Sequence, residues 1–95
     1  MRLSKQEIEV IKSVMHRFVK DAEIYLFGSR TRDDARGGDI DILLLSDKRI
    51  DLHTIIQMKI ALQDVLGEQK IDIVSQQHGS LTSFGRLAMM DGVRL

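Results

Sequence analysis

The sequence predicts an α+β fold, a small mixed β-sheet with helices packed mainly on one face. Segments in which apolar residues recur every three or four positions alternate with short runs of β-branched and aliphatic residues. Glycine and polar clusters separate these segments, and the chain has no proline. Together the patterns give the order helix, strand, loop, strand, helix, strand, helix, strand, and we expect one sheet face to stay open.

The first half of the chain opens with a helix signal. Ser4 followed by Glu7 fits a capping box, and apolar residues at helical spacing follow it, which predicts a helix over about 4–20. The next elements expected are a buried strand over 23–27, a glycine-containing loop over 28–38 and a second strand over 39–45.

The second half repeats the alternation. Asp51 opens a helix that ends at Gly67 and has Ile55, Met58, Leu62 and Val65 on one side. A third strand over 70–75, a short helix over 81–92 and a terminal strand over 93–95 complete the predicted order.

Composition narrows the function classes. With 95 residues, 43% of them apolar, the chain is expected to form a single domain over 1–95. It has no cysteine, which excludes disulfides and cysteine-bound zinc and suits the cytoplasm. The 14 basic and 14 acidic residues balance, so we expect no direct nucleic-acid binding, and no apolar run is long enough to span a membrane.

Acidic residues interrupt two of the predicted strands. Because strand side chains alternate between faces, Asp39 and Asp41 share a face, and Asp72 points away from the core in the third strand. A lone D-x-D is most often the charged, wet face of an edge strand. Here the outward positions that follow are Leu43 and Leu45, so the face is not simply solvated. If the strands are neighbours, three carboxylates converge and would suit magnesium.

The loop before Asp39 carries residues that favour phosphate binding. Gly28 and Ser29 follow a strand directly, and their N–H groups and the serine hydroxyl would donate to phosphate oxygens. Arg30 and Arg32 would neutralise a polyphosphate. Loop and strand together predict a site for a metal–nucleoside triphosphate complex, with two metal ions assisting an in-line displacement. The histidines are scattered and are expected to pack helices or lie on the surface.

The stretch "GSRTRDDARGGDID", with "KIDIV" further on, resembles the nucleotidyltransferases of the DNA polymerase β superfamily. The chain looks most similar to the minimal nucleotidyltransferases, antitoxins encoded beside a HEPN-type partner, and the resemblance covers about 24–74. It implies a polymerase-β-like core in which Asp39, Asp41 and Asp72 are catalytic and bind Mg²⁺. It assigns nucleotide binding to Gly28, Ser29, Arg30 and Arg32.

The same resemblance implies an activity and a partner. The expected reaction is Mg²⁺-dependent transfer of AMP from ATP to a tyrosine hydroxyl of a HEPN-type RNase toxin, within a hetero-oligomer of the two proteins. An alternative is a non-catalytic antitoxin that neutralises its partner by occlusion. The outward-facing Leu43 and Leu45 and the pair Met89–Met90 favour that alternative, because they would form an apolar contact surface.

Overall fold

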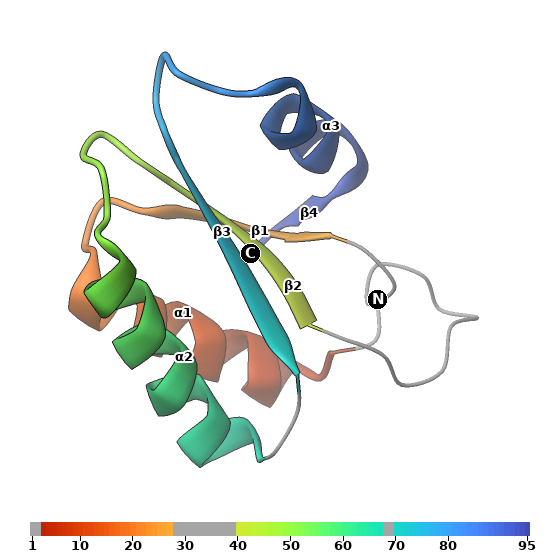
Figure 1. The fold of residues 1–95 in the computed structure, drawn as a ribbon. Coiled ribbons are helices and arrows are strands. Elements are labelled where there is room, and N and C mark those ends of the chain that lie inside the picture. The colour runs from red at the N-terminus through yellow and green to blue at the C-terminus, as the bar shows by residue number, and fades with distance from the viewer. Residues whose placement is uncertain (1–2, 28–39, 68–69) are drawn as a thin grey trace.

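A computed structural model of the chain, which describes residues 3–27, 40–67 and 70–95, shows a mixed sheet between helices (Figure 1). The order of elements predicted from the sequence is confirmed, and the predicted ends differ from the observed ones by a few residues at most. The elements are α1 (Lys5–Phe18), β1 (Glu23–Phe27), β2 (Ile40–Ser46), α2 (Leu52–Leu66), β3 (Ile71–Gln77), α3 (Ser83–Asp91) and β4 (Val93–Arg94).

The sheet has the strand order β3-β2-β1-β4. β1 pairs antiparallel with both β2 and β4, whereas β2 and β3 run parallel and are joined through α2. The α+β class with a mixed sheet is therefore confirmed. The two strands that carry aspartates are neighbours, which is the condition on which the convergence of carboxylates depended.

Both long helices begin where the sequence predicts. At α1 the backbone N–H of Glu7 donates to Ser4 Oγ (3.1 Å), and the N–H of Ser4 donates to Glu7 Oε1 (3.0 Å), so the capping box forms. At α2 the carboxylate of Asp51 accepts from the N–H of Thr54 (2.7 Å). Gly67 ends α2 at φ 89°, a left-handed conformation that favours glycine.

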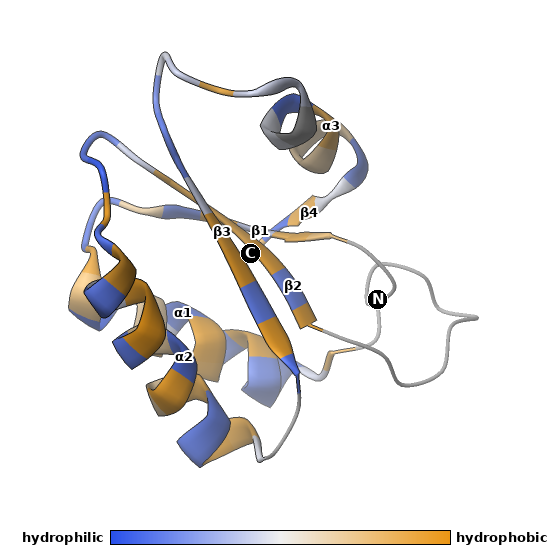
Figure 2. Ribbon diagram, in the orientation of Figure 1, coloured by the Kyte–Doolittle hydropathy of each residue, from blue (hydrophilic) through white to orange (hydrophobic). Residues whose placement is uncertain are grey.

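The main core lies between the sheet and the helices α1 and α2, whose apolar sides face one sheet surface (Figure 2). Met58 and Leu62 of α2 are fully buried, but Val65, expected on the same side of the helix, is 56% exposed. Leu66 packs against the core instead, and Val65 lies over a shallow groove beside α1. The sheet contributes Ile24, Leu26, Ile40, Ile42, Leu44 and Ile71 to this core.

The second sheet face is covered in part, because α3 packs on it. Tyr25 of β1, Leu43 of β2 and Ala88 of α3 form a smaller core there. Leu43 is fully buried and Leu45 is 2% exposed. The expectation that the two leucines form a contact surface is therefore wrong, and the second face is open only in part. The short helix at the end of the chain supplies the apolar cover that strand alternation could not reveal.

Candidate active site

Asp41 and Asp72 lie side by side at the start of two neighbouring parallel strands. They are direct register partners between β2 and β3, so their Cα atoms are separated by about the strand spacing of 4.8 Å. Both side chains are partly buried, on the sheet face opposite Ile40, Ile42 and Ile71. The predicted convergence of carboxylates is thus confirmed for these two residues.

Buried neighbours hold this pair in register. Ile40 and Ile71, one position before each aspartate, are register partners and are fully buried in the main core. The backbone N–H of Ile40 donates to the carbonyl oxygen of Lys70 (2.9 Å), which extends the strand pairing one residue further. Sliding one strand by a single residue would bury an aspartate and expose an isoleucine, so the core fixes the carboxylate pair.

The other predicted site residues lie outside the described part of the chain. These are Asp39, Gly28, Ser29, Arg30 and Arg32. The segment that contains these residues lies between two described strands: β1 ends at Phe27 and β2 starts at Ile40. Phe27 is the register partner of Asp41, so the segment leaves and re-enters the sheet next to that aspartate.

The donor chemistry of the pair fits a divalent cation. Magnesium is commonly held by one or two carboxylates together with substrate phosphates, and two aspartates in register provide such oxygen ligands. Within the ranges 3–27, 40–67 and 70–95, no group of three or more acidic, histidine or cysteine side chains forms a metal site. The described carboxylates would therefore bind the ion together with other ligands, such as a nucleotide.

A hollow of about 450 Å³ lies at the opposite end of β2, between the loop after α1 and the start of α2. Its lining includes Ser46, Asp47, Asp51 and Thr54 but neither Asp41 nor Asp72. Asp51 is engaged as the helix cap: hydrogen bonds from the side chain and backbone of Thr54 lower the pKa of its carboxyl. The hollow is therefore separate from the aspartate pair, which lies at the other end of β2.

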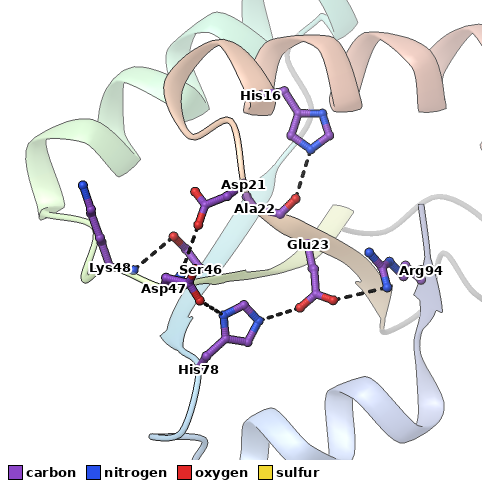
Figure 3. A network of polar contacts seen from close by, with 9 residues as sticks. All are labelled: His16, Asp21, Ala22, Glu23, Ser46, Asp47, Lys48, His78 and Arg94. Carbon is purple, nitrogen blue, oxygen red and sulfur yellow. Dashed lines mark hydrogen bonds and ion pairs between the residues drawn. The ribbon is translucent and has the colours of Figure 1, made fainter.

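A polar network at the same far end was not foreseen from the sequence (Figure 3). There His78 contacts the carboxylates of Glu23 and Asp47, residues more than 20 positions apart in the chain. Local spacing carries no signal for such a group. His16, by contrast, lies within hydrogen-bond distance of the carbonyl of Ala22 (Nε2···O, 3.0 Å), in line with the packing role expected for it.

Comparison with protein families decides the class of the chain. The family model described as "Polymerase beta, Nucleotidyltransferase" matches residues 9–94. The chain belongs to this nucleotidyltransferase family. The match begins within α1, runs to the end of β4 and includes the pair Asp41 and Asp72. A search of curated proteins gave no significant match.

Family membership gives the site a general chemistry. Nucleotidyltransferase domains use a nucleoside triphosphate and a divalent metal, and nucleotidyl transfer is the activity that the family supports for this chain. The two aspartates have the oxygen ligands that a divalent metal ion requires. Among the described residues, no helix of the nucleotidyltransferase is both long and apolar enough to cross a membrane.

Proposed function

We propose that this nucleotidyltransferase transfers AMP from ATP to a tyrosine hydroxyl of a HEPN-type RNase toxin, in a Mg²⁺-dependent reaction. The observation that carries the proposal is the register pairing of Asp41 with Asp72, on a chain that belongs to the polymerase β nucleotidyltransferases. The resemblance of its "LFGSR…DIDILL" stretch to the minimal nucleotidyltransferases supports the toxin as the acceptor.

In the proposed reaction, the hydroxyl oxygen of the acceptor attacks the α-phosphorus of ATP. A new P–O bond forms, the bond to the β-phosphate oxygen breaks, and pyrophosphate leaves. Asp41 and Asp72, together with Asp39, would hold the magnesium ions, which supply positive charge for the phosphate oxygens when bound. Asp72 serves as a ligand or as the base that takes the proton of the hydroxyl.

Nucleotide binding is assigned to the segment that starts directly after β1. Gly28 and Ser29 would donate to the phosphates through N–H and hydroxyl groups, and Arg30 and Arg32 would balance their charge. Phe27, the last described residue before this segment, pairs with Asp41. The phosphate-binding residues are thus covalently tied to the strand end beside the proposed metal ligands.

The described part of the chain offers no separate unit for an acceptor. Its three helices all pack on the one sheet. The proposal therefore takes the acceptor hydroxyl from another protein, the toxin, or from a second copy of the chain.

A second candidate function, neutralisation by binding alone, has an observation in its favour. On α2, Leu52, Ile56 and Ile60 recur every four residues and are 71%, 47% and 53% exposed, which forms one apolar stripe on the helix surface. Met90 on α3 is 79% exposed as well. These side chains take over the contact role that the sequence suggested for Leu43 and Leu45.

The test is intact-mass analysis of the protein encoded beside this one, after incubation with the purified chain, ATP and Mg²⁺. The proposal predicts a mass increase of one or more AMP units that maps to a tyrosine. The Asp72→Asn variant should give no increase, whereas Asp64→Asn, an exposed change on α2, should behave like the wild type. Absence of both modification and ATP binding in the wild type would sink the proposal.

The two candidate functions separate in a neutralisation assay with the toxin. Asp41→Asn should abolish neutralisation while leaving complex formation intact if the chain acts as an enzyme. Full neutralisation by that variant would favour occlusion. In that case Ile56→Lys, on the exposed stripe of α2, should disrupt the complex, because it places a charge in an apolar contact.

A further inference from the structure

The far end of the sheet carries a histidine held from both sides. His78, the first residue after β3, has Nδ1 2.7 Å from Asp47 Oδ1 and Nε2 2.6 Å from Glu23 Oε2 (Figure 3). Glu23 is the first residue of β1, and its other carboxylate oxygen lies 3.2 Å from Arg94 Nη1 in β4. Asp47 follows β2 directly. One imidazole thus links, directly or through Glu23, groups from the ends of all four strands.

These contacts have a simple proton requirement. An ionised carboxylate only accepts hydrogen bonds, so each of the two ring nitrogens must donate. The imidazolium has two N–H groups and satisfies both partners, whereas neutral imidazole has one. Neutral His78 would leave a nitrogen lone pair facing a carboxylate oxygen at 2.6 or 2.7 Å. The other carboxylate oxygen of Glu23 is paired with the guanidinium of Arg94.

The other charged groups around His78 agree with this assignment. Asp21, from the loop before β1, accepts from the N–H of Asp47 (3.4 Å) and adds negative charge on that side. Lys48 follows Asp47, and its described contact is made by its backbone N–H, which donates to Ser46 Oγ (3.3 Å). Among the described residues, the cations paired with these acidic side chains are therefore His78 and Arg94.

Further hydrogen bonds hold the backbone around His78 against the end of β2. The N–H of His78 donates to the carbonyl of Ser46 (2.9 Å), and Gln77 Nε2 donates to the carbonyl of Asp47 (3.0 Å). These bonds hold the imidazole beside the end of β2 whatever its charge. Loss of the ring proton would change the side-chain contacts without removing the ring from its position.

We propose that His78 acts as a pH-dependent clamp. Its imidazolium holds the start of β1 and the ends of β2 and β3 together, and deprotonation releases one of the two carboxylates. The clamp is separate from the proposed catalytic pair, because Ser46 and Gln77 stand at the ends of the strands that begin beside Asp41 and Asp72. It makes the stability of the fold sensitive to pH near neutrality.

The direction of the effect follows from linkage. Hydrogen bonds to Glu23 first, and to Asp47 second, raise the pKa of His78 above its ordinary value of 6.5. A raised pKa in the folded state stabilises the fold fully below the pKa of the unfolded chain. That contribution is lost as the pH rises through the folded-state pKa. The ring is 40% exposed, so solvent screens the interaction and limits its size.

The experiment measures the urea unfolding of the full chain between pH 5.5 and 9, with the ring protons of each histidine followed by NMR. We expect the pKa of His78 to lie above the ordinary histidine value of 6.5. We also expect the wild-type unfolding free energy to fall as His78 deprotonates. His78→Gln should lose that fall, and the matched control His53→Gln should keep it.

A variant of a partner provides an independent arm of the test. Glu23→Gln removes one acceptor charge, so it should lower the pKa of His78 toward the ordinary histidine value while the ring stays in place. If His78→Gln fails to fold, this titration still decides the matter. The proposal is overturned if the pKa of His78 in the wild type lies at or below 6.5, or if His78→Gln unfolds with the wild-type pH dependence.

Discussion

The two ends of the β2–β3 strand pair both gather acidic side chains, but they hold them differently. At the start of the strands, Asp41 and Asp72 lie next to each other in register. At the other end, Asp47 and Glu23 are separated by the ring of His78, which lies within 2.7 Å of both. The first end presents two adjacent carboxylates, and the second places a protein cation between them.

This difference separates the proposed ligand site from a structural contact. Like charges at neighbouring strand positions repel each other, and a bound cation would offset that repulsion. A carboxylate pair bridged by an imidazolium has its charge balanced within the protein. Changes at the two ends should therefore have different consequences. Activity should be lost at the end with Asp41 and Asp72, and stability at the end with His78.

The largest expected effect comes from breaking the catalytic end. Asp72→Asn removes a charged ligand from the pair and should reduce nucleotidyl transfer at least about a hundredfold, since electrostatic stabilisation of this kind commonly has that size. Its urea midpoint should equal or exceed that of the wild type, because repulsion with Asp41 is relieved. Steady-state transfer assays and urea unfolding of the same preparation measure both. A variant that keeps wild-type activity would remove Asp72 from the site.

The second expected effect tests the face that lies between the two ends. Leu43 is fully buried against Tyr25 and α3, so Leu43→Ala should destabilise the fold by about 2–5 kcal/mol. Leu87→Ala is the matched control: Leu87 is 57% exposed on α3, and its loss should change stability by less than about 0.5 kcal/mol. Equal urea midpoints for the two variants would mean that α3 does not cover this face.

The third and smallest effect concerns the attachment of α3 and β4 to β1. A Cβ added at Gly92 would meet the backbone oxygens of Ala88 and Leu26, the latter at 2.8 Å. Neither backbone atom moves freely, so Gly92→Ala should cost about 1–3 kcal/mol by overpacking.

Because β4 carries Arg94, Gly92→Ala should also weaken the ion pair with Glu23. Met90→Ala, an exposed change two residues earlier, is the control for thermal unfolding. A Gly92→Ala protein as stable as the Met90→Ala protein would show that the backbones of α3 and β1 can separate without cost.

Much of the fold could be predicted because its signals are local. The capping box of Ser4 and Glu7, the cap at Asp51 and the alternation around Asp41 and Asp72 each depend on residues a few positions apart. The buried isoleucines next to the aspartates fixed which face they share, so the carboxylate pair could be predicted once the strands were taken as neighbours.

The features that could not be predicted depend on contacts between distant parts of the chain. Val65 follows the helical spacing of buried residues, yet it faces a groove beside α1, because the sheet beneath α2 meets Leu66 instead. Leu43 has the alternation of an exposed position, but α3, some 40 residues further on, covers it. The bridge from His78 to Glu23 spans 55 positions. No short-range pattern encodes such contacts.

The most direct test of the central claim, a metal–nucleotide site at Asp41 and Asp72, is paramagnetic broadening by Mn²⁺ in the presence of ATP. The account predicts that backbone signals of Asp41 and Asp72 broaden at low Mn²⁺ concentration while those of Asp47 and His78 do not, and that Asp72→Asn abolishes the effect. Broadening centred on His78 and Asp47, or equal broadening at both ends of the sheet, would contradict it.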